Sequence, residues 1–140
     1  MYRRIILAVD LPDLSTAPKG LAEALELAKA WGGDLRLVNV VAVVPTTFME
    51  YVPADFDATQ TKRATETLNT VIAGIDLPAE RKSGAARAGS IYHELLEEAA
   101  DWNADLIVVG SHRPVMSDYL LGSNAKTIVR HAQCSVLVVR

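Results

Sequence analysis

Short apolar runs alternate along the chain with stretches in which apolar residues recur at helical spacing. Four largely apolar runs cover residues 5–9, 35–44, 106–110 and 135–139, and the run 5–9 is continuous. A run without polar alternation is typical of a strand buried on both faces, as in a parallel sheet. A fifth strand is expected near 81–89, although Gly84 and several alanines give this stretch a low strand propensity.

Four amphipathic stretches between these runs predict helices. Their apolar stripes are Leu21, Leu25, Ala28 and Trp31; Ala64, Leu68, Val71 or Ile72, and Ile75; Ile91, Leu95, Ala99 and Trp102; and Ala125, Ile128 and Val129. Ser15 or Thr16 is expected to cap the first helix, Ser90 the third and Ser123 the fourth, because a hydroxyl can accept a bond from a free backbone N–H. The stretch 45–58 contains two prolines and no helical period, and it is predicted to be a loop.

The order β-α-β-α-β-α-β-α-β predicts one α/β domain over residues 1–140, with an open twisted five-stranded parallel sheet and helices on both faces. In such a sheet, ligands bind beyond the carboxyl ends of the strands, where the strand order reverses. The positions to inspect are therefore Val9-Asp10, the stretch from Asn39 to Val41, and Val109-Gly110.

Composition argues against several kinds of partner. The formal net charge is −3 and the basic residues are scattered, which disfavours nucleic acid and anionic membrane surfaces. The run 5–9 is too short for the apolar region of a signal peptide, and no run approaches the roughly 18 residues of a membrane helix. The single cysteine, Cys134, allows no disulfide within the chain and favours a cytoplasmic location.

No catalytic set is evident from spacing. The three histidines are far apart and predict no zinc site. Glu94, Glu97 and Glu98 are interpreted as a solvated helix face, and Trp31 and Trp102 as core residues at helix ends. No Ser-His-Asp arrangement can be argued from the sequence.

The segment 110–123 carries the clearest candidate chemistry. Neither a G-x-G-x-x-G nor a G-x-x-x-x-G-K-[ST] phosphate loop occurs in the chain. A helix N-terminus can still bind phosphate through its free N–H groups, and Gly122-Ser123 precedes a predicted helix. Lys126 in the first turn opposes the helix dipole, and a bound anion would reverse that effect. The alternative is an ordinary loop end with a helix cap.

Three stretches together resemble the universal stress protein family. They are RRIILAVDL, ADLIVVGSH and LLGSNAKTIVRHAQCSVLVV. The family's nucleotide signature is Gly, two residues, Gly, nine residues, then Gly followed by Ser or Thr, and Gly110 and Gly122-Ser123 match its two ends. In the middle, Arg113 stands where the signature has glycine, and the interval to Gly122 is one residue shorter. The amino-acid sequence of this segment is similar to that of a bacterial branch of the family that carries the shortened loop.

The resemblance implies a Rossmann-like fold of the adenine nucleotide alpha hydrolase type, with sheet order 3-2-1-4-5. It also implies binding of ATP or another adenine nucleotide, with Mg²⁺ as a candidate companion, and a regulatory role in stress response. The implied binding residues are Ala8, Val9, Asp10, Val40, Val41, Val109, Gly110, Ser111, His112, Arg113, Gly122, Ser123, Asn124 and Ala125. Val40 and Val41 would lie beside the adenine, and residues 111–113 over the phosphates. Asp10 would approach the ribose or a phosphate-bound metal; otherwise it is a loop acid that caps a neighbouring N-terminus.

The last strand is expected at a sheet edge, where an apolar strand can pair with another chain. The resemblance implies a homodimer through Val136, Leu137, Val138 and Val139, and leaves room for an unidentified regulatory protein partner. Two alternatives stay open. One is a weak ATPase or autophosphorylating protein, for which no catalytic base is evident. The other is a dimeric interaction module that has lost its nucleotide.

Overall fold

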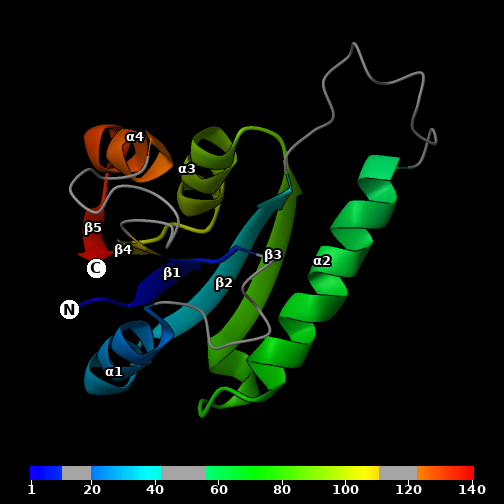
Figure 1. Cartoon of the computed structure of the whole chain (residues 1–140). Helices are drawn as coiled ribbons and strands as arrows, with labels where there is room; N and C mark the ends of the chain where they lie inside the picture. Colours follow the sequence, from blue (N-terminus) through cyan, green and yellow to red (C-terminus); the bar gives the residue numbers. More distant parts are fainter. Residues whose placement is uncertain (11–19, 42–55, 111–122) are drawn as a thin grey trace.

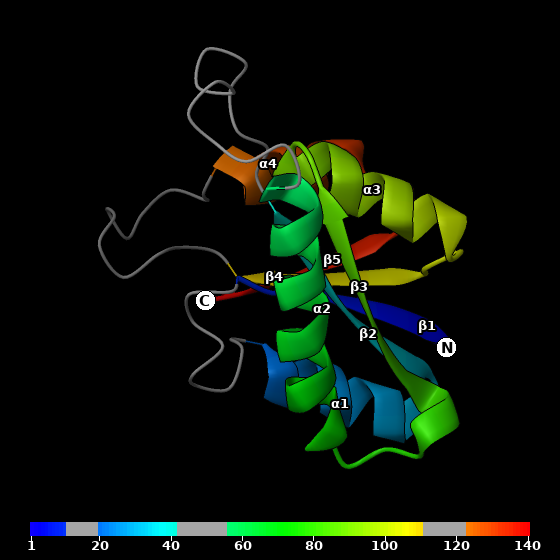
Figure 2. The ribbon, with the colours of Figure 1, turned by 90° about the vertical axis from the view of Figure 1, so that its right-hand side faces the viewer.

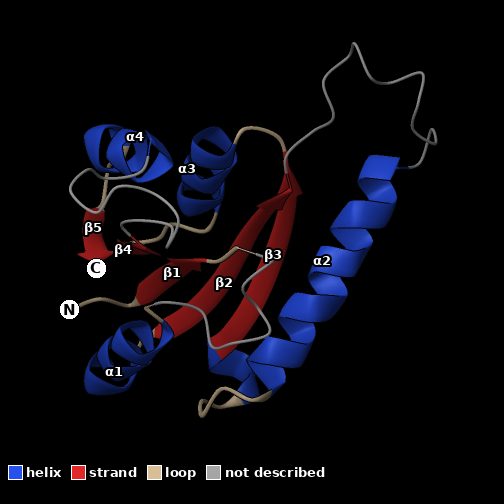
Figure 3. Ribbon diagram, viewed as in Figure 1, coloured by secondary structure: helices blue, strands red, loops and turns tan. Residues whose placement is uncertain are grey.

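The computed structural model describes residues 1–10, 20–41, 56–110 and 123–140. Its strands are β1 (Arg4–Ala8), β2 (Asp34–Val41), β3 (Lys82–Ala88), β4 (Leu106–Gly110) and β5 (Ser135–Val139). Its helices are α1 (Leu21–Trp31), α2 (Phe56–Ala73), α3 (Ile91–Asp101) and α4 (Ser123–His131), with a 3-10 turn, η3 (Ala79–Arg81), before β3. The strands form one parallel sheet in the order β3-β2-β1-β4-β5 (Figures 1 and 3). The predicted α/β class and strand order are confirmed.

Helices cover both faces of the sheet (Figure 2). On the face that we call the α1/α2 face, Ala24 of α1 and Leu68 of α2 pack with alternate strand residues such as Leu7. On the opposite α3/α4 face, Leu95 of α3 and Ile128 of α4 pack with the remaining strand residues. Burial on both faces explains why the strands appear in the sequence as continuous apolar runs.

The small residues of β3 are explained by the helix above them. A Cβ added to Gly84 would lie 2.6 Å from Cδ1 of Ile72 and 3.5 Å from Cβ of Leu68, both on α2. The strand nevertheless pairs with β2 over its whole length. Close packing under α2 therefore requires residues that have a low intrinsic strand propensity.

The first helix begins later than predicted. The residue before α1 is Gly20, which has a left-handed conformation with φ 87°, and the helix starts at Leu21. Glycine adopts that conformation without the steric cost that a side chain would add. The predicted caps, Ser15 and Thr16, lie outside the described residues.

The second helix begins earlier than predicted. It starts at Phe56, so the end of the stretch 45–58 is helical rather than a loop. Residues 42–44, predicted to extend the second strand, lie outside the described part of the chain. Ser90 stands at the N-cap of α3 as predicted, but its side chain makes no capping bond.

Two apolar side chains predicted to point inward are exposed. Trp31 is 38% exposed and packs edge-on against Tyr2, and Val129 is 46% exposed. Both lie toward the ends of their helices, where the sheet no longer covers the whole stripe. Among the described helices, none combines the length and apolar character needed to cross a membrane.

The prediction of one solvated glutamate face on α3 is wrong for Glu98. This residue is 7% exposed, and its carboxylate accepts hydrogen bonds from Nη1 of Arg36 at 2.6 Å and Nη1 of Arg87 at 2.8 Å. Arg36 on β2 is 62 residues from Glu98 in the sequence, whereas Arg87 on β3 is 11 residues away. Nε of Arg87 also donates to half-buried Glu94 at 2.9 Å, so that residue is not fully solvated either. Only the packing of α3 against the sheet brings these charges together.

Candidate functional site

The point where the strand order reverses lies between β1 and β4. The chain leaves β1 toward β2 on one side of the sheet and leaves β4 toward β5 on the other. The carboxyl ends of β1, β4 and β5 lie on the same side of the molecule, at the left of Figure 2, and α4 also begins there. This is the position at which the sequence analysis expects a ligand.

The pairing of β1 with β4 stops before the two strands end. Their last paired residues are Leu7 and Val108, although β1 continues to Ala8 and β4 to Gly110. By contrast, pairing with β2 continues to the end of β1, and β4 and β5 are paired to the ends of both strands. Beyond Leu7 and Val108 the carboxyl ends of β1 and β4 are therefore unpaired with each other, and we call this place the switch point.

Three candidate residues are brought together beside the switch point. Ala8, Val109 and Ala125 belong to one apolar cluster on the α3/α4 face, which joins the end of β4 to the first turn of α4. Val109 is 3% exposed and Ala125 is 6% exposed, so both side chains lie in the core and only their backbone groups could serve a ligand. Val9 packs in the cluster on the opposite face.

Other candidates are more accessible. Asp10 is exposed two residues after the end of β1, while Gly110 and Asn124 are half-buried at the end of β4 and in the first turn of α4. Val40 and Val41 are half-buried at the end of β2, one strand away from the switch point. The described part of the site thus consists of three strand ends and one helix start.

The candidate phosphate loop, residues 110–123, is described only at its two ends. Ser111, His112, Arg113 and Gly122 lie outside the described residues, and for Ser123 only its position as the first residue of α4 is described. Within the described ranges, no group of three His, Cys, Asp or Glu side chains is placed to hold a metal ion.

One buried polar residue at this end of the sheet was named from the sequence only as part of the strand end to inspect, without a specific role. Asn39 on β2 is 3% exposed, and its Nδ2 donates a hydrogen bond to the carbonyl oxygen of Val9 at 2.9 Å. Its Oδ1 is buried and has no hydrogen-bond partner among the residues that the structure describes. The available signal was a single amide side chain inside the apolar run 35–44.

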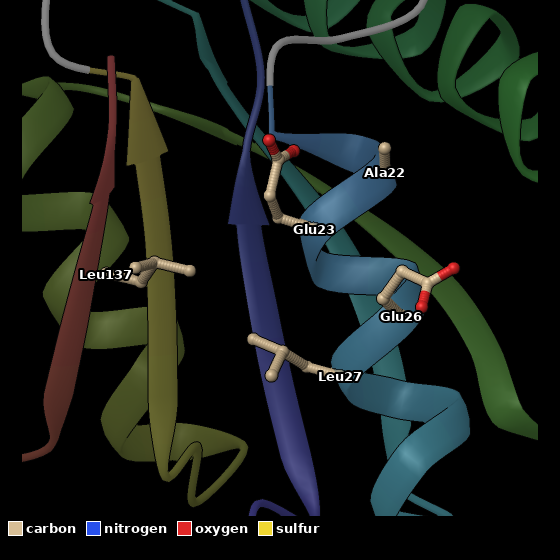
Figure 4. A pocket seen from close by; sticks show the side chains of 5 residues that line it. All are labelled: Ala22, Glu23, Glu26, Leu27 and Leu137. Carbon is tan, nitrogen blue, oxygen red and sulfur yellow. The ribbon is translucent and has the colours of Figure 1, made fainter.

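A shallow groove lies elsewhere, between α1 and β5 on the α1/α2 face (Figure 4). It is lined by Ala22, Glu23, Glu26, Leu27 and Leu137. Leu27 and Leu137 point toward each other across it, and both glutamates lie on α1. Because it runs along the middle of β5, it is separate from the strand ends that form the switch point.

The edge strand β5 carries the candidate dimer residues. It is the last strand of the sheet and pairs with β4 on its inner side. Val136, Leu137, Val138 and Val139 are half-buried rather than enclosed. The described structure is therefore compatible with addition of another strand at this edge.

Comparison with known proteins gives a family match over the whole chain. The Universal stress protein family matches residues 1–140. Universal stress protein G of Shigella flexneri is 34% identical over 143 residues, which covers 100% of both chains. Universal stress protein A homolog 1 of Coxiella burnetii is 32% identical over 142 residues, covering 99% of this chain and 96% of the relative.

Solved structures show the same fold. Universal stress protein UspA from Lactobacillus plantarum has a TM-score of 0.79 at 23% identity, covering 99% of this chain and 98% of that protein. The universal stress protein from Archaeoglobus fulgidus in complex with dAMP has a TM-score of 0.63 at 21% identity, with 99% and 98% covered. A universal stress protein in complex with cAMP has a TM-score of 0.62 at 19% identity, with 99% and 97% covered.

Proposed function

The chain belongs to the universal stress protein family, and from that premise we propose that it binds an adenine nucleotide at the switch point and has a regulatory role in the stress response. The observation that carries this proposal is the separation of β1 from β4 beyond Leu7 and Val108, on the side where α4 begins. Ligands of open α/β sheets bind at such points. The complexes of related proteins with dAMP and cAMP support the adenine nucleotide class.

The finer proposal is that the ligand is ATP, bound with Mg²⁺. The adenine would lie beside Val40 and Val41, and Asp10 would approach the ribose or the phosphate-bound metal. The phosphates would lie over Ser111, His112 and Arg113 and against the start of α4, from Gly122 to Ala125. Free N–H groups and the helix dipole at the start of α4 favour an anion there. Lys126 is exposed in this first turn, and a bound phosphate would turn its unfavourable position into a favourable one.

We also propose that residues 1–140 form one domain that works as a homodimer through β5. The support is the half-buried apolar edge from Val136 to Val139. A two-fold axis across this edge would extend the sheet into the second copy. Cytoplasmic residence and a regulatory protein partner stay predictions from the sequence.

The direct test is the identity of the nucleotide that the chain retains. The protein is purified without added nucleotide and denatured, and the released small molecules are separated by anion-exchange chromatography. We expect an adenine nucleotide and a rise in the unfolding midpoint on adding millimolar ATP with Mg²⁺, because a ligand stabilises the state it binds. ADP that accumulates during incubation would favour the ATPase alternative. An empty protein without a thermal shift would contradict nucleotide binding and favour the interaction module.

A variant pair tests the phosphate position. Ser123→Glu places a carboxylate at the start of α4 and should weaken ATP binding at least about tenfold, because like charges in close proximity repel by more than about 1 kcal/mol. Gln133→Glu adds the same charge at an exposed position before β5, away from the carboxyl ends of the strands. This variant should bind ATP like the parent. Unchanged affinity of Ser123→Glu in calorimetric titration would show that the phosphates lie elsewhere.

A further inference from the structure

Asn39 ties the end of β1 to β2. Its Nδ2 donates to the Val9 carbonyl oxygen, and the Val9 N–H donates to the Val38 carbonyl oxygen, each at 2.9 Å. Both backbone polar groups of Val9 are thus held from β2, although the paired register of the two strands ends at Ala8. The bond to the Val9 carbonyl oxygen comes from a side-chain amide, just beyond the last backbone pair of the two strands.

Packing alone does not explain an amide at this position. Leu35 and Leu37, the alternate residues before Asn39 on β2, are fully buried in the apolar cluster of the α1/α2 face. Asn39 is nearly as buried, and within the described part of the chain its Oδ1 meets no hydrogen-bond donor. A buried acceptor without a partner is unfavourable, so an apolar side chain would suit the surroundings better. What asparagine adds over an apolar residue is its hydrogen bond to the Val9 carbonyl oxygen.

This hydrogen bond acts at the carboxyl end of β1, where the candidate site begins. The peptide between Val9 and Asp10 is planar, so a bond to the Val9 carbonyl also sets the direction in which Asp10 leaves the strand. On the other side of β1, pairing with β4 has already ended at Val108. The end of β1 is therefore held toward β2 and away from β4.

We propose that Asn39 is a positioning residue of the nucleotide site. It holds the Val9–Asp10 peptide on β2, which keeps the ends of β1 and β4 apart and directs Asp10 toward the ribose or phosphates of an adenine nucleotide. This inference rests on the proposed function. Asn39 acts through the backbone of Val9 and does not itself touch the ligand.

The experiment combines a ligand-free measurement with a binding measurement on the full chain. Asn39→Leu removes the donor and keeps the branching of the side chain, and Asn39→His restores a ring N–H. Leu37→Val, one step earlier on the same face of β2, is the control for a change in packing. The carbonyl ¹³C signal of Val9 and the amide signal of Asp10 are recorded without ligand by NMR. Affinities for AMP and for ATP with Mg²⁺ are then measured by calorimetry, and unfolding midpoints are measured in parallel.

We expect Asn39→Leu to shift the Val9 and Asp10 signals and to weaken nucleotide binding. The expected loss of affinity is roughly three- to tenfold, the size of one net hydrogen bond. Asn39→His should recover both the signals and the affinity. Leu37→Val should lower the unfolding midpoint and bind with parental affinity.

Three results would overturn the inference while leaving nucleotide binding intact. They are parental affinity of Asn39→Leu, unmoved Val9 and Asp10 signals in that variant, and an affinity loss in Leu37→Val as large as in Asn39→Leu. Failure of the parent chain to bind either nucleotide would instead overturn the proposed function, and this inference with it.

Discussion

On the α1/α2 face of the sheet the buried side chains among the described residues are apolar except for Asn39, whereas on the α3/α4 face a buried glutamate lies between two arginines. On the first face, α2 lies directly on β3, whose Gly84 leaves space for the helix. On the second face, α3 packs against β2, and Arg36 and Arg87 extend from β2 and β3 to reach Glu98. Close contact between α2 and β3 thus requires a small residue, whereas long charged side chains link α3 to β2 and β3.

The ion pairs on the two faces differ in their exposure to water. Lys29 of α1 binds Asp76 at 2.7 Å, but these side chains are 45% and 88% exposed. The Glu98 side chain is 10% exposed between arginines that are 24% and 25% exposed. The Arg36 guanidinium also lies over the ring of Trp102, 4.5 Å from its centroid. The enclosed pair is thus bound on several sides, whereas the exposed pair competes with water.

Removal of Glu98 should have the largest effect on stability. Glu98→Ala leaves Arg36 and Arg87 without their shared carboxylate, and the free energy of unfolding should fall by about 3 kcal/mol, near the low end for a broken buried pair because both arginines are partly exposed. Glu97→Ala, an exposed neighbour on the same helix, should change it by less than about 0.5 kcal/mol. Urea unfolding followed by circular dichroism measures both. Equal values for the two variants would remove the contrast between the faces.

Filling the space under α2 should have the next largest effect. Gly84→Val would bring a branched side chain into Ile72, and should destabilise the protein by about 1–3 kcal/mol through overpacking. Gly74→Ala is the control, because an added Cβ there meets only an ordinary contact at 3.5 Å. If Gly84→Val unfolds at the parental urea midpoint, close packing of α2 does not dictate the small residues of β3.

Acid should weaken the α3/α4 face selectively. Burial by itself would raise the pKa of Glu98, but hydrogen bonds from Arg87 and Arg36 outweigh it and hold that pKa below its ordinary value of 4.5. The stabilisation is therefore complete above about pH 4.5 and is lost as the pH falls through the lower folded pKa. Unfolding midpoints of the parent should fall more steeply below pH 4.5 than those of Glu98→Gln. Parallel curves would show that the ionisation of Glu98 is not coupled to folding.

Loss of the exposed pair should have the smallest effect. A hydrogen bond from Lys29 and its charge lower the pKa of Asp76, but the carboxylate is in water. Asp76→Asn should leave the unfolding midpoint within the scatter of replicate measurements, because exposed pairs gain little over solvation. Destabilisation comparable with that of Gly84→Val would mean that this pair helps to hold α1 against the end of α2.

The family resemblance and the local pattern predicted different parts of the structure. Continuous apolar runs and helical stripes predicted the alternation of strands and helices, since each element buries its own residues. The strand order came from the resemblance, because periodicity does not show which strands are neighbours. The ends of elements were predicted less well: Gly20 rather than a hydroxyl residue precedes α1, and Phe56 begins α2 inside a predicted loop.

For the candidate site, the sequence identified the strand ends and the start of α4, and motif spacing pointed to 110–123. It did not show that Val109 and Ala125 are enclosed in the core, or that β1 leaves β4 after Leu7. The contribution of each loop residue to ligand binding stays a prediction.

The sequence by itself determined the order and approximate places of the strands and helices and that the chain belongs among parallel α/β proteins, because local periodicity records which sides of an element are buried. Tertiary structure alone decided the roles of polar residues that meet across long stretches of chain. Asn39 meets Val9 across 30 residues, and Arg36 meets Glu98 across 62. Their hydrogen bonds depend on strand order and helix placement, and a local pattern carries no record of partners that only the packed sheet brings together.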